Sequence, residues 1–143
     1  MRLFSNLSIF LLVGCGTGII YGPASFDETQ LDSDIHRVTF RGNQHPATGE
    51  LCLLRCAEVC LNEGYSHFEV IDSETGSSIE NIHPRFPFDR HYSLMDTFIE
   101  DLPFVAKTIR LFKSKPTAGF AYEARSIKTS LTSKYGIGEI GDP

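Results

Sequence analysis

The residue with the most specific chemistry in this chain is Cys15, because of what precedes it. Arg2 supplies a positive charge, residues 3–13 form an apolar run, and a small residue stands directly before the cysteine. This arrangement is typical of a secretory signal peptide and its cleavage site, here over residues 1–14. The residues before the cysteine are Leu12, Val13 and Gly14, which complete a bacterial lipobox. The sequence therefore predicts export, followed by transfer of a diacylglycerol to the Cys15 thiol through a thioether.

A lipidated Cys15 would anchor the protein without a membrane-spanning helix. Cleavage frees the cysteine amine for a further acyl chain such as palmitate, and two or more chains give stable anchoring. A transmembrane helix is the weaker interpretation, because a span needs roughly 20 apolar residues and Ser5, Asn6 and Ser8 interrupt this run. Gly16 stands where an aspartate marks inner-membrane retention in enteric lipoproteins. We therefore expect the periplasmic face of the outer membrane, with peptidoglycan or another envelope protein as the partners to consider.

Three further cysteines are spaced four residues apart, at Cys52, Cys56 and Cys60. Side chains at this spacing share one helix face, but helix geometry seldom permits a disulfide between them. Joined by His36 or His67 they would offer metal ligands, yet the short CxxC loops common in structural zinc sites are absent from the sequence. Free cysteine commonly behaves as a small buried hydrophobe. We expect mostly free thiols, with Cys56 and Cys60 in the core, and no metal.

Two other patterns are weaker candidates for chemistry. The segment His83–Asp96 contains two histidines, arginines and a serine, from which a hydrolase site can be sketched, but neither GxSxG nor HExxH occurs. Gly136, Gly138 and Gly141 form a GxGxxG, which cradles phosphate only between a strand and a helix. Here a flexible tail over residues 136–143 is the expectation. A formal net charge of −5 also argues against nucleic acid as a partner. No nucleotide or other cofactor is expected.

A basic strand face is the best candidate for contact with a ligand. Between residues 36 and 41, Val38 and Phe40 alternate with Arg37, Thr39 and Arg41, which is typical of a half-buried strand. Guanidinium groups suit bidentate capture of the carboxylates or phosphates that peptidoglycan and lipid A carry. A solvated sheet face commonly carries such charges for solubility alone, so both interpretations stay open.

The remaining periodicities predict the elements that would position this face. We expect a tether over residues 15–34, one globular domain over 35–135, and a long loop over 73–103. Within the domain an amphipathic helix spans 49–63, with Thr48 as N-cap, Gly64 just beyond its end, and Arg55 and Glu58 on its wet side. Strands at 65–72 and 104–115 and a helix carrying Phe120, Ala124, Ile127 and Leu131 follow. The predicted fold is α/β (α+β) in two layers. A three-stranded sheet packs against two helices in the order β-α-β-loop-β-α, with a right-handed βαβ unit.

Several short motifs together resemble a family of small uncharacterised proteobacterial lipoproteins. They are R-V-x-F-R-G-N at residues 37–43 and L-L-R-x-A-E at residues 53–58, with Gly64, Tyr65, Phe68, Val70 and residues 121–124 also fitting. The resemblance covers roughly residues 29–70 and the last helix. The cysteines of the first helix depart from the pattern, where Ala or Thr is usual. No activity or partner is established for that family, so the resemblance implies export and lipidation only.

These observations favour a non-catalytic interaction or structural protein held at a membrane of the cell envelope. The alternative is a small envelope hydrolase or metal-binding protein that uses the His83–Asp96 loop and the cysteine helix. A bound metal, or a closed pocket joining that loop to His67, would favour the alternative.

Overall fold

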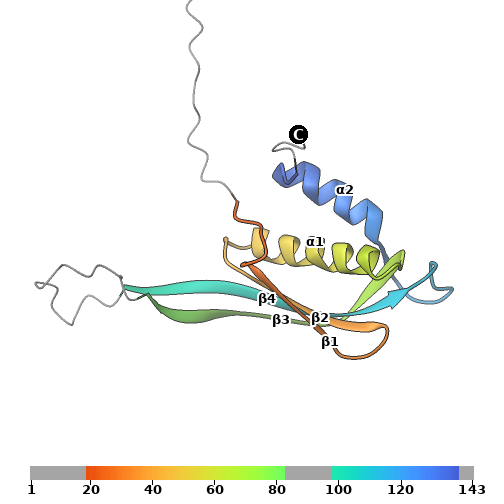
Figure 1. The fold of residues 1–143 in the computed structure, drawn as a ribbon, viewed down its shortest axis with the longest axis horizontal. Coiled ribbons are helices and arrows are strands. Elements are labelled where there is room, and N and C mark those ends of the chain that lie inside the picture. Colours follow the sequence, from red (N-terminus) through yellow and green to blue (C-terminus); the bar gives the residue numbers. More distant parts are fainter. Residues whose placement is uncertain (1–18, 83–97, 139–143) are drawn as a thin grey trace, which may run out of the picture.

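The computed structural model describes residues 19–82 and 98–138. Its centre is a five-stranded antiparallel sheet with strand order β1-β2-β4-β3-β5 (Figure 1). The strands are β1 (Phe26–Gln30), β2 (Ile35–Arg41), β3 (His67–Ile82), β4 (Phe98–Phe112) and β5 (Tyr122–Glu123). The α+β class agrees with the sequence-based prediction, but the prediction of three strands was wrong. Strands β2 and β3 both pair antiparallel with β4 and therefore run parallel to each other, so β2, α1 and β3 form a split βαβ unit.

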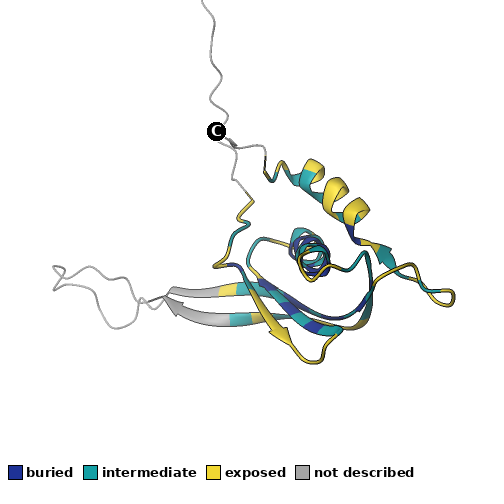
Figure 2. Cartoon of the chain, turned by 45° about the vertical axis from the view of Figure 1, so that its right-hand side comes forward, coloured by how far each residue is buried: buried dark blue, intermediate teal, exposed yellow. Residues whose placement is uncertain are grey.

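Helix α1 (Ala47–Asn62) covers one face of the sheet and forms the core with it. In β2 the residues Val38 and Phe40 are fully buried beneath α1, whereas their neighbours Arg37 and Arg41 are not, as the alternation predicted. Figure 2 shows α1 end-on, with its buried side directed at the buried strip of the sheet. The large core residues from the helix and the strands are Val38, Phe40, Leu51, Leu54, Phe68, Ile109 and Leu111.

The sequence-based prediction was correct at the C-terminal end of α1 and wrong at its N-terminal end. At the C-terminal end Gly64 has φ +79°, and Tyr65 N–H donates to the Cys60 carbonyl, so the predicted position of this glycine is confirmed. At the N-terminal end the prediction of Thr48 as N-cap was wrong. The helix begins two residues earlier than predicted, after Pro46, and the Thr48 hydroxyl donates to the Gly42 carbonyl at 3.0 Å. This buried hydroxyl therefore ties the helix to the end of β2.

Helix α2 (Ala124–Tyr135) packs on α1 and forms a third layer, where two layers were predicted (Figures 1 and 2). Its apolar residues Ala124, Ile127 and Leu131 face the core, and it ends at Gly136, as expected. Phe120 precedes the helix and is 70% exposed, so its assignment to this apolar face was wrong. Near the end of α2, Lys134 and Tyr135 each donate a hydrogen bond of 2.6 Å to Glu50 of α1. These bonds lower the pKa of Glu50 and hold α2 antiparallel to α1.

The prediction of a flexible tether over residues 15–34 was wrong wherever the structure describes that range. Strand β1 pairs with β2 from Phe26 opposite Phe40 to Gln30 opposite His36. The sequence does not show the alternating pattern of a strand here. Only the first residue of the strand, Phe26, is apolar and directed inward, and the next inward residue is Glu28. The globular domain therefore begins well before residue 35.

The predicted long loop over residues 73–103 also contains regular structure. Strands β3 and β4 stay paired from His67 opposite Phe112 to Ile82 opposite Phe98. Strand β2 ends where Arg41 lies opposite Phe104, so beyond this point β3 and β4 continue alone as a two-stranded arm (Figure 1). The six paired residues of each strand in the arm correspond to about 20 Å of projection. Residues 83–97 lie outside the described residues.

Candidate functional site

The sheet presents its second face to solvent, and the predicted basic residues lie on it. No helix of the described ranges covers this face, as the two views of the ribbon agree (Figures 1 and 2). Arg37 lies opposite Thr108, Thr39 opposite Ala106, and Arg41 opposite Phe104. The period of two that predicted one shared face is therefore confirmed. We call this surface the open face; it consists of Asp27, Thr29, Arg37, Thr39, Arg41, Glu69, Asp72, Glu74, Phe104, Ala106, Thr108 and Arg110.

Carboxylates from β3 neutralise part of the open face. Arg37 donates to Glu74 at 2.7 Å and lies 3.7 Å from Asp72, while its second guanidinium nitrogen donates to Thr108. Arg110 pairs with Glu69 at 3.1 Å. Arg41 is exposed, and among the described residues it has no ion-pair partner. Arg41 therefore offers the free guanidinium of this face, and Arg37 is held in a fixed position beside it.

A hollow lies where the arm leaves the sheet, on the side of α1, since Thr75, Ser77 and Pro103 share the inner face with Val105. Its volume is about 510 Å³, and its lining combines the turn after β2 with both strands of the arm: Gln44, His45, Thr75, Gly76, Ser77, Asp101 and Pro103. Gly76 is closely covered by the Phe104 ring, which an added Cβ would approach to 2.8 Å. Any larger residue at this position would push the ring away. The sequence carried no signal for this hollow, because its walls come from a segment that was predicted to be a loop.

Cys56 and Cys60 lie in the core, as expected, and Cys52 lies there as well. Each is fully buried and free, and the Cys60 thiol donates to the His67 carbonyl at 3.4 Å. Burial raises the pKa of Cys60 to about 11 and that of Cys56 well above its ordinary value. A thiolate, which is the form that binds metals, is therefore disfavoured there. Within residues 19–82 and 98–138, no group of three or more His, Cys, Asp or Glu side chains is placed to hold a metal ion.

Replacing both Cys56 and Cys60 by alanine should destabilise the domain by about 1 to 2 kcal/mol, less than a Leu-to-Ala cavity costs. The reason is that each thiol fills core volume without carrying a charge. Chemical denaturation checks the free energy of unfolding, and elemental analysis of wild type and variant should give the same metal content. Stoichiometric zinc in the wild type that is lost in the variant would show that the cysteines are ligands.

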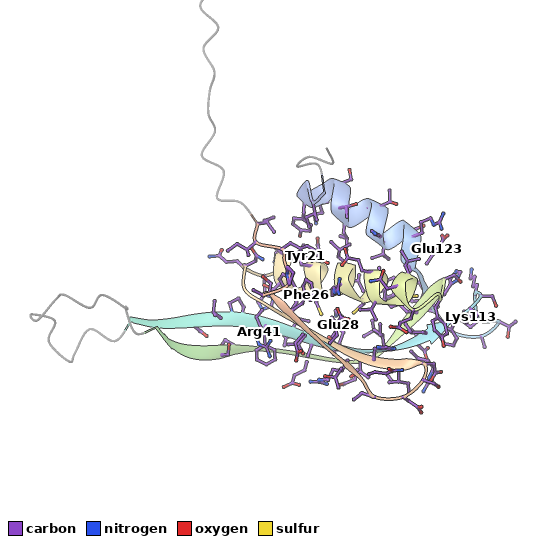
Figure 3. The ribbon with its side chains drawn as sticks, viewed as in Figure 1. Tyr21, Phe26, Glu28, Arg41, Lys113 and Glu123 are labelled. Carbon is purple, nitrogen blue, oxygen red and sulfur yellow. The ribbon has the colours of Figure 1, made fainter. Side chains whose placement is uncertain are left out.

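A network of polar side chains that the sequence did not reveal fastens the N-terminal segment to α1. Arg55 donates to Glu28 of β1 and, at 2.8 Å, to Glu58, while its guanidinium carbon lies 4.0 Å from the Phe26 ring centre. The Tyr21 hydroxyl donates to Glu58 at 2.7 Å. Figure 3 shows Tyr21, Phe26 and Glu28 along the segment that passes this helix. The assignment of Arg55 and Glu58 to a wet helix side was wrong, because their side chains are only 19% and 17% exposed.

The pKa shifts of Tyr21 and Arg55 agree with the partial burial of this network. Burial and the hydrogen bond to Glu58 raise the pKa of Tyr21, so the hydroxyl keeps its proton. Burial opposes the charge of Arg55, but the hydrogen bonds to Glu58 and Glu28 outweigh it and raise its pKa. One guanidinium and two carboxylates therefore hold the N-terminal segment against α1. We call this network of Tyr21, Glu28, Arg55 and Glu58 the clamp.

The other predicted site residues lie outside the described residues or away from any site. The lipobox, Leu12, Val13, Gly14 and Cys15, and the whole His83–Asp96 segment fall outside. Gly136 and Gly138 follow α2 instead of opening a helix, so the context required for a phosphate loop is not met there. None of the helices in the described ranges is long and apolar enough to cross a membrane.

The fold and this face define a small α+β domain with a one-sided antiparallel sheet, a charged open face and a projecting arm. Searches of protein-family models, of curated proteins and of solved structures found no match to this chain. Its function is therefore argued from its own residues.

Proposed function

We propose that this protein is a lipid-anchored component of a bacterial cell envelope, whose domain has a non-catalytic interaction role. The observation that carries the proposal is the apolar run that ends in Leu12, Val13, Gly14 and Cys15. The buried positions of Cys52, Cys56 and Cys60 support it, since none of these thiols is accessible to an acylating enzyme. Cys15 is the remaining cysteine of the chain.

The open face is the surface we assign to the partner. Arg37 and Arg41 are four residues apart on one strand, about 13 Å along it, which suits an extended anionic glycan or peptide. Arg37 already shares its charge with Glu74 and Asp72, so Arg41 carries most of the proposed contact. The proposed partner is peptidoglycan or another envelope protein that presents carboxylates.

Labelling with palmitate tests the anchor. Cys15→Ser should leave an unprocessed precursor without label, because serine offers no thiol for the thioether. Cys60→Ala is the matched control, since it also removes one cysteine and should be labelled like the wild type. Equal labelling of Cys15→Ser and wild type would refute the lipoprotein assignment.

The double substitution Arg37→Gln with Arg41→Gln tests the open face. Folding stability should change by less than about 1 kcal/mol, because exposed ion pairs contribute little. The variant should be lipidated normally but should lose crosslinking to its partner or co-sedimentation with peptidoglycan, and the wild-type signal should weaken with added salt.

Arg125→Gln is the control for this experiment, because Arg125 is exposed on α2, on the other side of the molecule. It should bind like the wild type. If the double variant also binds like the wild type, the arginines are merely solvated and the open face is not the contact surface.

A further inference from the structure

The chain is held firmly to the domain from Ile20 onward. The Ile20 backbone N–H donates to the Asn43 side chain at 3.1 Å, and the Asn43 amide donates back to the Ile20 carbonyl at 2.8 Å. One residue later, the Tyr21 ring lies 5.8 Å from the ring centres of both Phe26 and Phe40. Together with the Tyr21–Glu58 hydrogen bond, these contacts fix the point at which the chain leaves the domain.

This fixed point lies very close in sequence to the proposed lipid attachment. Only residues 16–19 separate Cys15 from Ile20. A fully extended chain gains at most about 3.6 Å per residue, so Ile20 lies within about 18 Å of Cys15. The tether expected from the sequence, residues 15–34, was about five times as long in residues. A domain held on so short a chain must lie against the surface into which its lipid inserts.

The surface around Ile20, where the chain leaves the domain, exposes apolar side chains. Ile20 is 70% exposed and Ile19 is 40% exposed, although both have large aliphatic side chains. Ile19 lines a hollow of about 200 Å³ together with Tyr21, Tyr135 and Ile137. Aliphatic side chains partition into the acyl boundary, while tyrosines prefer the headgroup level, where the ring and the hydroxyl are both satisfied.

We propose that the surface formed by Ile19, Ile20, Tyr135 and Ile137 docks the domain on the lipid bilayer. This inference rests on the proposed lipidation of Cys15. Ile19 lines its hollow with residues at the end of α2, and Tyr21 lies on the same helix side of the sheet, whereas the open face lies on the opposite side (Figures 1 and 3). Docking therefore turns Arg37, Thr39 and Arg41 away from the membrane and toward whatever fills the periplasmic space.

A tryptophan reporter tests the docking, because the chain contains no tryptophan of its own. The full lipidated protein is reconstituted into phosphatidylcholine vesicles with brominated acyl chains, which quench tryptophan at short range. The Ile20→Trp variant should lose about half of its emission relative to vesicles without bromine, since interfacial side chains reach 5–10 Å into the boundary. Ile19→Trp is the second reporter, in case the first substitution disturbs the Asn43 contact.

Thr29→Trp is the matched control, because Thr29 is exposed on the open face. It should keep its emission. Equal quenching of Thr29→Trp would overturn the proposed orientation, and unquenched reporters at both 19 and 20 in vesicle-bound, palmitate-labelled protein would overturn the docking alone. Protein that carries no palmitate and does not bind vesicles would instead refute the lipid anchor, and the docking with it.

Discussion

Phe40→Ala should destabilise the protein by about 3 to 5 kcal/mol, which is the usual cost of removing a fully buried phenylalanine. Phe40 is 0% exposed and lies on the inner face of β2, opposite Phe26 of β1 and Val105 of β4. Its ring also stacks on Tyr21. The cavity would therefore open beneath α1 at the point where the N-terminal segment is attached. Urea unfolding of the purified protein measures the loss as a lower midpoint.

Phe120→Ala provides the control for this prediction, since Phe120 is 70% exposed. It should change stability by no more than about 0.5 kcal/mol. If Phe40→Ala does not fold, Phe40→Leu keeps part of the volume and should fall between the alanine variant and the wild type. Identical midpoints for Phe40→Ala and wild type would show that α1 does not pack on this residue.

Arg55→Ala should cost about 2 to 3 kcal/mol, which is just below the usual cost of breaking a fully buried ion pair, because the group is not fully enclosed. The substitution leaves Glu28 and Glu58 close together without the guanidinium between them and removes the contact with the Phe26 ring. The free energy of unfolding and the protease sensitivity of the N-terminal segment should change together, because Glu58 also holds Tyr21.

Two companion variants separate charge from packing at this clamp. Arg55→Met keeps an apolar stem over Phe26 but leaves both carboxylates unpaired, so it should cost nearly as much as alanine. Adding Glu58→Gln to Arg55→Met should recover part of the loss, because one of the two charges is then removed. Should Arg55→Met be as stable as the wild type, the clamp contributes through packing and its charges are incidental.

Local periodicity was sufficient to predict which residues are buried in the elements that pack on the core with one face. The alternation of Val38 and Phe40 with Arg37, Thr39 and Arg41 follows from the period of two in a strand, and the structure confirms which residues are buried. The same reasoning placed Cys56 and Cys60 in the core, since a helix repeats its face every three to four residues. The αL position of Gly64 was also predictable from residue type alone.

Elements that are stabilised by distant partners could not be predicted in this way. Strand β1 presents Glu28 inward, which is favourable only because Arg55 of α1 meets it there. The arm has no core of its own in the described residues, and its pairing depends on β3 and β4 meeting across a long separation in sequence. The pairing of Arg37 with Glu74, which changes the charge of the candidate site, has the same cause.

The predicted lipobox and the one-sided core therefore rest on local patterns that any short window of the sequence displays. The path of the N-terminal segment, the stacking of α2 on α1 and the hollow at the base of the arm depend on contacts between residues far apart in sequence. Such contacts form only when the sheet and α1 have already brought their partners together, because the entropy of ordering them must be offset by neighbouring contacts. For that reason residues 19–34, which the sequence predicted as part of a flexible tether, contain a strand and contacts that fasten them to α1 in the folded protein.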